Sequence, residues 1–379
     1  MSAVVSRPGA LGRIWWGPAP GLAERVLLAP LSGAEGLFRL GVAVRGALYD
    51  RGLLRAVSAP VPVLSVGNLC IGGAGKTPVV LALGERLLRA GHRPAVLSRG
   101  YGALAEGPRV VSDGKSVLLE AGRGGDEPVL LARRLPDLRV VCGPDRAEVA
   151  RIAVSDLGAD VLLLDDGFQH RRLRRDLDVV VLDASNPFGN GHCLPRGPNR
   201  EPARALSRAD LIWLTHADRA SPTRLEELRA TARSFTGRDP VESRHAPREV
   251  LDGSLERSFG LASLSGARLG LITGVARPES VLRTVESLGA SVVLSRDYPD
   301  HHRFTEAELA EALAAAEAAG ARELVTTEKD AVRLPPGAER EPRLRVLRID
   351  AEVLRGEDGL VAAVAGALGA GLRGRGGKG

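Results

Sequence analysis

A glycine-rich turn between two hydrophobic segments is the part of this sequence with the clearest chemistry. Residues 63–80 read VLSVGNLCIGGAGKTPVV: a strand-like run, a turn ending in Gly-Lys-Thr, and the start of a helix. In such a turn glycines let backbone N–H groups point inward, the lysine reaches the β- and γ-phosphates, and the threonine hydroxyl can bind Mg²⁺. The helix N-terminus adds positive partial charge, and proline suits its first turn. The expected nucleotide-binding residues are Gly72, Gly73, Ala74, Gly75, Lys76, Thr77 and Pro78. The strict pattern has glycine where this chain has Cys70, and a plain strand–helix turn is the alternative.

A second hydrophobic run, VLLLDDGFQH over residues 161–170, ends in two acids. Asp165 or Asp166 could bind Mg²⁺ directly or through water, as nucleotide-binding enzymes require beside the phosphate site. The alternative is that the two acids cap a helix and form a turn. His170 could orient a phosphate or a carboxylate, and a purely structural role is its alternative.

Three further segments carry residues that could transfer protons or contact a nucleotide. Asp126, in the segment GGDEP, is either a helix N-cap or a carboxylate that accepts a proton from an attacking hydroxyl. The run Asp300-His301-His302 suggests a metal site, but no third ligand has suitable spacing, and a histidine paired with a carboxylate is the simpler interpretation. Residues 326–330, TTEKD, could contact nucleotide or cap a loop.

A long loop rich in Gly, Pro and Asn covers residues 183–202 and follows a strand-like run directly. Loops of this length inside a compact domain usually have a function. Arg196, Arg200 and Glu201 are its members expected near an anionic substrate. The basic run 171–175 could bind phosphate or lipid, or form a solvated face.

The elements that must position these residues alternate between strand and helix, which predicts an α/β fold with a parallel sheet flanked by helices, as in P-loop nucleotide-binding proteins. Strand-like runs in the first part cover 63–66, 95–98, 139–142, 161–164, 179–182 and 211–215. Helical patterns cover 79–90, 127–135, 146–157 and 223–235.

After residue 238 the pattern pauses and then resumes, which predicts a second, smaller α/β/α domain. Expected strands cover 269–273, 291–294, 323–326 and 343–349, and expected helices cover 279–288, 306–319 and a last stretch ending near residue 368. The expected organisation is an N-terminal amphipathic segment (1–55) belonging to the first domain, a nucleotide-binding domain (56–238), a linker with a possible short strand near 241–250 (239–265), a second domain (266–368) and a disordered basic tail (369–379).

Composition narrows the class of protein. The 379 residues are 44% hydrophobic and 26% charged, with a net charge of +6, which favours anionic partners such as nucleotides, phosphorylated substrates or acidic lipids. Nucleic acid is the least favoured anionic partner, because aromatic residues, which stack on bases, make up only 3% of the chain. The three cysteines form no CxxC pair, which indicates a reduced cytoplasmic compartment.

The N-terminal segment allows two interpretations. No apolar run of 18 residues and no signal-peptide pattern occur. Residues 21–50 nevertheless place hydrophobic residues among arginines, which fits either an amphipathic helix on a membrane surface or a helix packed on the domain core.

Taken together, the motifs resemble the tetraacyldisaccharide 4′-kinase family of lipid A biosynthesis. The resemblance rests on SVGNLCIGGAGKTP (65–78), SRGYG (98–102), GGDEP (124–128), DDGFQH (165–170), PFGNGHCLPRGPNREP (187–202), TGVARPESV (273–281), DHHRF (300–304) and TTEKDAVRL (326–334).

The resemblance implies a kinase that transfers the γ-phosphoryl group of ATP, with Mg²⁺, to the 4′-hydroxyl of tetraacyldisaccharide 1-phosphate, forming lipid IVA. It implies two α/β/α domains joined by a short two-stranded linker, with ATP in the larger domain. It also implies a peripheral protein at the cytoplasmic face of the inner membrane, in contact with an acidic membrane surface. Neither nucleic acid nor an obligate protein partner is implied.

The resemblance also implies roles for individual residues. Asp126 would be the catalytic base, His301 its tuning partner and Lys76 the phosphate-binding lysine. Thr77, Asp165 and Asp166 would bind the metal, and the N-terminal helix would contact membrane and acyl chains. The residues expected near the substrate are Tyr101, His170, Arg200 and Glu201. The chain departs from the family at Cys70, where Ser or Thr is usual, and at Asn199, where an aliphatic residue is usual.

Two alternatives belong to other classes. A P-loop GTPase or ATPase of the metallochaperone type would use water as acceptor and could bind metal through Cys or His. A non-enzymatic nucleotide-binding module at a membrane surface would bind nucleotide without turnover.

Overall fold

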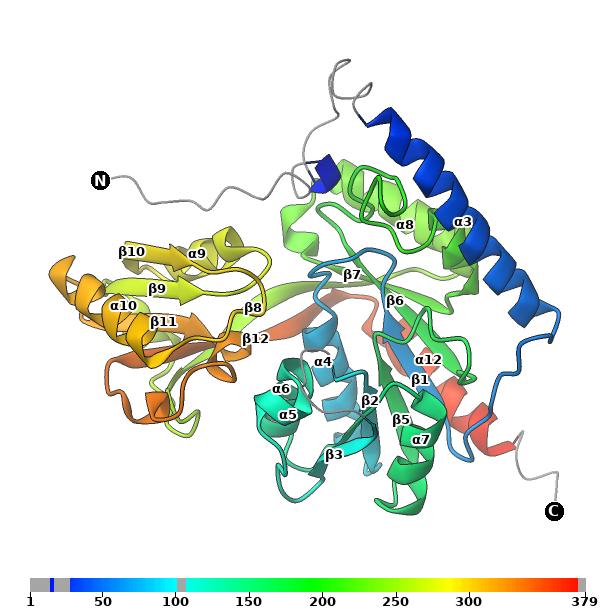
Figure 1. Cartoon of the computed structure of the whole chain (residues 1–379), viewed down its shortest axis with the longest axis horizontal. Helices are drawn as coiled ribbons and strands as arrows, with labels where there is room; N and C mark the ends of the chain where they lie inside the picture. The colour runs from blue at the N-terminus through cyan, green and yellow to red at the C-terminus, as the bar shows by residue number, and fades with distance from the viewer. Residues whose placement is uncertain (1–13, 17–27, 101–106, 374–379) are drawn as a thin grey trace.

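The computed structural model describes residues 14–16, 28–100 and 107–373, and Figure 1 shows their arrangement. Within these ranges the strands form a twelve-stranded sheet in the order β10-β9-β11-β12-β8-β7-β6-β1-β5-β2-β4-β3. The strands of the first half of the chain lie at one end of this order and those of the second half at the other. We call these two parts the first half and the second half.

The strands of the first half are hydrophobic runs with few alternating polar positions, which is typical of strands covered on both faces. All but the edge strand β3 pair in parallel; β3 runs antiparallel to β4 and was not predicted. Their bounds are β1 Val63–Gly67, β2 Pro94–Ser98, β3 Arg109–Asp113, β4 Arg139–Cys142, β5 Val161–Asp165, β6 Leu177–Asp183 and β7 Leu211–Thr215.

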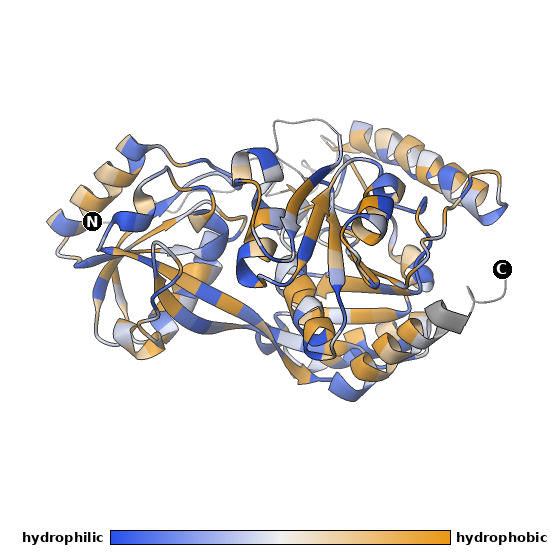
Figure 2. Cartoon of the chain, turned by 90° about the horizontal axis from the view of Figure 1, so that it is seen from below, coloured by the Kyte–Doolittle hydropathy of each residue, from blue (hydrophilic) through white to orange (hydrophobic). Residues whose placement is uncertain are grey.

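Helices cover both faces of this part of the sheet. The helices of the first half are α4 Lys76–Arg89, α5 Ala121–Gly124, α6 Asp126–Arg134, α7 Arg146–Ser155 and α8 Pro222–Thr236. Buried side chains of α4 and α6 share one core with β1, β5, β6 and β7, whereas α7 and α8 belong to two clusters on the other face. Figure 2 shows hydrophobic residues along the strands between these helices.

Two long strands join the halves. β8 (Val241–Asp252) pairs in parallel with β7 at its start and antiparallel with β12 (Leu344–Arg355) along its length. The segment 239–265, expected to be a linker with a possible short strand, therefore contains the long strand β8. Ten residue pairs between β8 and β12 satisfy backbone groups that a loop would leave to water.

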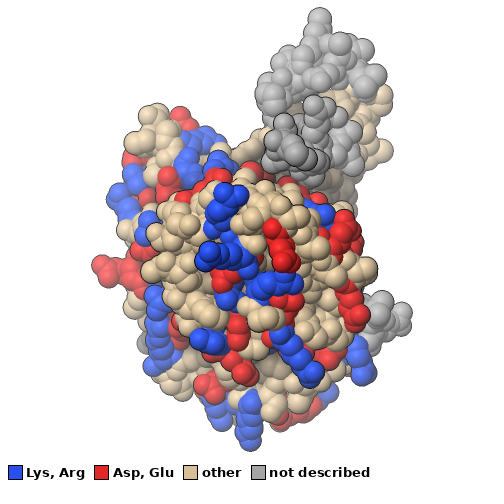
Figure 3. All heavy atoms as spheres, turned by 90° about the vertical axis from the view of Figure 1, so that its left-hand side faces the viewer, with Lys and Arg blue, Asp and Glu red and all other residues tan. Residues whose placement is uncertain are grey.

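The second half repeats the layered arrangement on a smaller scale. Its remaining elements are β9 Arg268–Thr273, α9 Pro278–Ser287, β10 Ser291–Asp297, α10 Glu306–Ala318, β11 Glu323–Thr327 and α11 Glu328–Ala331. Buried residues of α9 and α10 lie in separate clusters. The predicted α/β fold is confirmed. In Figure 3, which faces the second half, Lys and Arg are intermixed with Asp and Glu rather than gathered into one patch.

The last helix, α12 (Glu357–Arg373), packs against the first half, although the sequence placed it with the second. Leu360, Ala363 and Ala367 are buried in the core that also contains α4 and β1. The helix also runs past residue 368, so the part of the expected disordered tail up to residue 373 is helical; residues 374–379 lie outside the described ranges. The proposed domain boundaries remain a prediction.

The N-terminal helix α3 (Ala29–Asp50) lies along the outside of the first half (Figure 1). Among the helices described, none is both long enough and apolar enough to cross a bilayer. Short 3₁₀ segments complete the chain: Ala203–Arg208, Ala217–Arg219, Leu261–Leu264 and Ala338–Arg340.

Candidate active site

The glycine-rich turn connects β1 to α4 and ends at Gly75, the N-cap residue of α4. Gly75 has φ +77°, and a Cβ at this position would lie 2.7 Å from Nε2 of His245, so only glycine fits. Helix α4 begins at Lys76, three residues before the predicted start, and this places Thr77 and Pro78 in its first turn. The N–H groups of that turn and of the preceding glycines could bind an anion.

The paired acids lie at the carboxyl end of β5, beside this turn. Lys76 Nζ is 3.2 Å from Oδ1 of Asp166, and Arg200 Nη1 donates to its Oδ2 at 2.7 Å. Burial alone would raise the pKa of Asp166, but the charges of Lys76 and Arg200 outweigh burial and lower it. Lys76 and Arg200 therefore meet at the carboxylate of Asp166.

Asp165 has fewer partners than its neighbour. Its Oδ2 accepts a hydrogen bond from Ser98 Oγ at 3.2 Å. Burial, together with the negative charge of Asp166, raises its pKa to about 6. Two adjacent carboxylates with opposite pKa shifts form an electrostatically unbalanced pair, and a cation between them would relieve the imbalance.

Asp126 and His301 meet across the two halves. Nδ1 of His301 lies 3.1 Å from Oδ2 of Asp126, although the residues are 175 positions apart. Asp126 is 3% exposed, and Oδ1 has no hydrogen-bond partner among the described residues. Gly125 is the N-cap of α6, and the Asp126 side chain makes no capping bond. The geometry thus favours the proton-accepting alternative over the cap.

His301 reaches this carboxylate from a strained backbone. Its φ of +65° is rare for a residue with a side chain and marks a position that the surroundings over-determine. Beside the pair, Nε of Arg333 is 3.7 Å from Oδ2 of Asp126, and Lys329 Nζ lies 3.3 Å from Glu127. The TTEKD segment therefore shapes the border between the halves. Within the part of the chain that the structure describes, no group of three or more His, Cys, Asp and Glu side chains could hold a metal ion.

Other residues expected near the substrate have varied positions. Glu201 forms a two-pronged ion pair with Arg208 (2.9 Å for both contacts), so it stabilises the loop rather than facing the acids. His170 has a buried Nε2 that lacks a partner in the described chain, and burial with the charge of Arg146 lowers its pKa to about 4. Tyr101 lies outside the described residues. In the basic run 171–175, Arg171, Arg172 and Arg175 form ion pairs with acids of this chain.

The two departures from the family pattern contact each other. Cys70 Sγ donates to Oδ1 of Asn199 at 3.0 Å and lies 3.2 Å from the carbonyl oxygen of Pro187. A backbone bridge also joins residues 70 and 199. The glycine-rich turn is thereby attached to the loop that carries Arg200.

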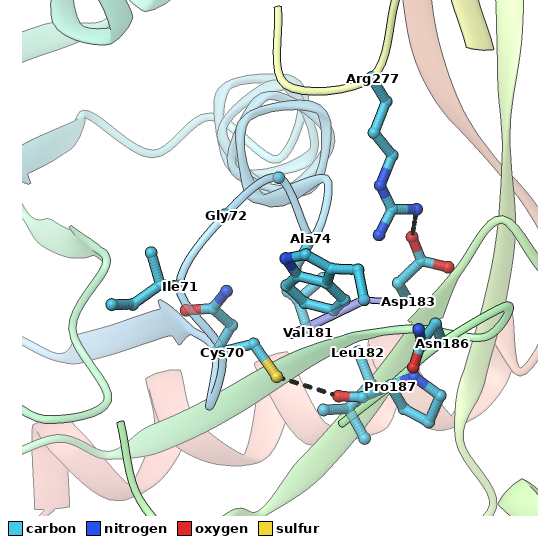
Figure 4. A pocket seen from close by; sticks show the side chains of 13 residues that line it. Cys70, Ile71, Gly72, Ala74, Val181, Leu182, Asp183, Asn186, Pro187 and Arg277 are labelled. Atoms are coloured by element: carbon cyan, nitrogen blue, oxygen red, sulfur yellow. Dashed lines mark hydrogen bonds and ion pairs between the residues drawn. The ribbon is translucent and has the colours of Figure 1, made fainter. Parts of the chain in front are cut away.

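Sequence reasoning missed a group of residues that lies near Gly72 and Ala74 of the glycine-rich turn. Asp183 ends β6, His216 follows β7, and Arg277 precedes α9; the ring of His216 lies 3.2 Å from Asp183 through Nδ1. Figure 4 shows Arg277 pointing toward Asp183 at a pocket that Gly72 and Ala74 also line. A charged residue at the end of a parallel strand was the available signal.

Comparison with known proteins gives a consistent result. A family model described as tetraacyldisaccharide-1-P 4′-kinase matches residues 24–368. Proteins called tetraacyldisaccharide 4′-kinase from Anaeromyxobacter sp. (strain Fw109-5) and Syntrophus aciditrophicus (strain SB) are 63% and 44% identical to this chain. The two alignments cover 94% and 86% of this chain and 96% and 89% of the relatives.

A solved structure agrees with these relatives. LpxK from Aquifex aeolicus, crystallised in complex with ATP, is 29% identical, with a TM-score of 0.73 over 91% of this chain and 99% of its own. The resemblance inferred from the motifs is thus confirmed: this chain belongs to the tetraacyldisaccharide 4′-kinase family.

Proposed function

We propose that this chain transfers the γ-phosphoryl group of ATP to the 4′-hydroxyl of tetraacyldisaccharide 1-phosphate, forming lipid IVA. The observation that carries the proposal is the arrangement of two groups around one site. The glycine-rich turn places Lys76 beside Asp166, and Asp126 pairs with His301. The two groups are linked through Asp165, whose pKa is raised by burial, by the charge of Asp166 and also by the charge of Glu127, the residue after Asp126. A phosphate site with an adjacent proton acceptor is what phosphoryl transfer to an alcohol requires.

In the proposed mechanism, Lys76 and the N–H groups of the turn bind the β- and γ-phosphates. Asp126 accepts the proton of the 4′-hydroxyl, whose oxygen forms a bond to the γ-phosphorus. The bond from the γ-phosphorus to the β,γ-bridging oxygen breaks, and ADP leaves with that electron pair. His301 holds the carboxylate of Asp126 in position. Arg200 neutralises the negative charge of Asp166 beside Lys76.

Mg²⁺ fits the oxygen-rich end of the site. Thr77, Asp165 and Asp166 would supply the hydroxyl and carboxylate donors that Mg²⁺ prefers. Burial and then the negative charge of Asp166 raise the pKa of Asp165 to about 6, and a bound cation would favour its ionised form. When bound, the ion would neutralise the β- and γ-phosphate oxygens.

Helix α3 supports a membrane-surface location because its polar side faces the protein and its apolar side faces outward. Glu35 is its buried residue, bonded to His192 Nδ1 (3.0 Å) and to the backbone N–H of Cys193 (2.9 Å). Leu37 and Leu40 are 74% and 60% exposed. A helix attached in this way offers its leucines to lipid. We propose that the protein lies at the cytoplasmic face of the inner membrane, as the family resemblance implies.

The proposal is tested with γ-labelled ATP and Mg²⁺, with and without the lipid acceptor. Label transferred to lipid only when the acceptor is present supports the kinase. Release as free phosphate, equal with and without acceptor, would support the water-using alternative, which the named relatives do not favour. Nucleotide binding without turnover would support the non-enzymatic module.

A further inference from the structure

Arg277 belongs to the second half but lies at the phosphate-binding turn of the first. It precedes α9 as the N-cap residue, and its Nη1 donates to Oδ2 of Asp183, at the end of β6. Arg277 and Asp183 line one pocket together with Gly72, Gly73 and Ala74 of the turn (Figure 4). The guanidinium therefore lies beside residues expected to bind phosphate.

The contacts around Arg277 keep its segment close to that turn. A Cβ on Gly73 would lie 3.7 Å from Cβ of Ala276, and one on Gly72 would lie 3.7 Å from the ring of Trp16. The Arg277 guanidinium is 5.8 Å from the centroid of that same ring. A short movement of one flexible side chain would be enough to reach an anion held by the turn.

Asp183 does not depend on Arg277 alone for compensation. Its Oδ2 is 3.2 Å from Nδ1 of His216, and its Oδ1 accepts bonds from the backbone N–H and the hydroxyl of Ser185 at 2.9 and 2.6 Å. Asp183 is buried, whereas the Arg277 side chain is 29% exposed. If the arginine left, the Asp183 carboxylate would keep its two hydrogen bonds from Ser185.

The segment that carries Arg277 is also joined to the segment that carries His301. The carbonyl oxygen of Gly274 accepts bonds from the His301 backbone N–H (3.2 Å) and from Arg333 Nη1 (3.0 Å), and its N–H donates to Asp330. The segment that holds His301 against Asp126 is therefore the one that holds Arg277 beside the turn.

We propose that Arg277 is a nucleotide-binding residue supplied by the second half, whose guanidinium exchanges Asp183 for phosphate oxygens when ATP occupies the turn. The inference rests on the proposed function for the identity of the nucleotide. A guanidinium binds phosphate through two parallel N–H donors, and arginines delivered from another domain stabilise charge in phosphoryl transfer. The same contact would couple ATP binding to closure of the two halves.

The test is ATP binding by calorimetry with Mg²⁺ and no lipid acceptor, so that its outcome is independent of whether the lipid is phosphorylated. Arg277→Ala should weaken ATP binding by about tenfold or more, because the charge-assisted hydrogen bonds are lost. Arg277→Lys should weaken it by less, because lysine keeps the positive charge without the two parallel donors. The matched control is Arg219→Ala, which removes a hydrogen bond (2.9 Å) between the halves to Ser280 of α9 but does not line the pocket. The control should stay within about twofold of the unmodified chain.

Asp183→Asn separates phosphate binding from a purely structural ion pair. If Arg277 binds phosphate, this variant should bind ATP as tightly as the unmodified chain or more tightly. An equal loss in Asp183→Asn and Arg277→Ala, or a near-normal affinity of Arg277→Ala, would overturn the proposal. Should Asp183→Asn fail to fold in a thermal scan, added guanidinium ion decides: partial restoration of ATP binding to Arg277→Ala supports the proposal, and no restoration overturns it.

Discussion

The carboxylate of Asp126 is buried at the start of α6, with one oxygen bonded to His301 and the other lacking a hydrogen-bond partner in the described chain. A buried acceptor without a donor is costly, so such groups usually serve a purpose that the resting structure does not show. Accepting a proton from a bound sugar hydroxyl would satisfy the free oxygen. At the residue scale this is the central chemical expectation.

Asp126→Asn should lower kcat by about 10²- to 10⁴-fold while ATP affinity stays unchanged, because only activation of the acceptor is lost. Steady-state kinetics with the lipid acceptor and calorimetric ATP titration measure the two quantities. Glu148→Gln is the control: it removes an exposed carboxylate in the first turn of α7 and should keep most of the activity. An unaltered kcat in Asp126→Asn would exclude Asp126 as the base.

His245 gives a pH-dependent prediction. Burial, reinforced by the charges of His216 and Arg219, lowers its pKa from 6.5 to about 3. Because the folded state holds the neutral ring, the stabilisation is complete above the unfolded pKa of 6.5 and is lost as pH falls toward 3. His245→Asn should therefore reduce the slope of the free energy of unfolding against pH in this window, by at most about 1.4 kcal/mol per pH unit.

Urea unfolding between about pH 5 and pH 7 measures that slope. Ser234→Asn, at an exposed position of α8 without a titrating side chain, is the control and should leave the slope unchanged. Identical slopes for His245→Asn and the unmodified chain would contradict the prediction.

At the element scale, α3 is unusual because polar contacts attach it to the protein. Besides Glu35, Arg45 donates to the carbonyl oxygen of Gln169 at 3.1 Å, and Arg171 reaches Gly46 and Asp50. These bonds connect the helix to the DDGFQH segment and to the loop that precedes Arg200. A lipid-facing helix would in this way be positioned next to the phosphoryl-transfer site.

Replacing Leu37 and Leu40 together by Ser should weaken binding to anionic vesicles by about tenfold or more, because the apolar area offered to lipid is lost. Vesicle co-sedimentation measures binding, and the melting temperature should hardly change because both side chains are exposed. Leu354→Ser, at an exposed leucine of β12, is the control. Equal vesicle binding by all three proteins would argue against α3 as the membrane contact.

At the scale of the whole molecule, the chain passes from the first half to the second through β8 and comes back through β12. Helix α12, which follows β12, therefore packs in the first half. The core of the first half therefore includes residues of α12. The two crossing strands are the continuous connection across which His301 and Arg277 reach the first half, so changes in their bending would shift both residues together.

Leu360→Asp should lower the free energy of unfolding by about 3 kcal/mol or more, because it places a charge in the core of the first half. Val361→Asp is the matched control one position along: Leu360 is fully buried, whereas Val361 is 54% exposed, and its change should cost about 0.5 kcal/mol or less. Urea unfolding measures both. A similar cost for the two variants would mean that α12 is not part of this core.

The sequence by itself predicted the parts of the candidate site that depend on neighbouring residues. The turn from Gly72 to Thr77 and the acids that end β5 are read locally, because glycine conformations, helix starts and strand periodicity are set within a few residues. The same periodicity predicted most strands and helices, and errors fell at β3, β8 and the end of α12, where edge pairing or distant packing decides.

Only the tertiary structure decided which distant side chains meet. The residues around Asp126 left a helix cap open, and only the family resemblance named His301 as its partner before the fold brought the two together. Nothing near Asp183 or Arg277 in sequence predicted their ion pair. Such contacts arise from how the halves pack around β8 and β12. Packing sums many small interactions over the whole chain, so no local pattern can encode it.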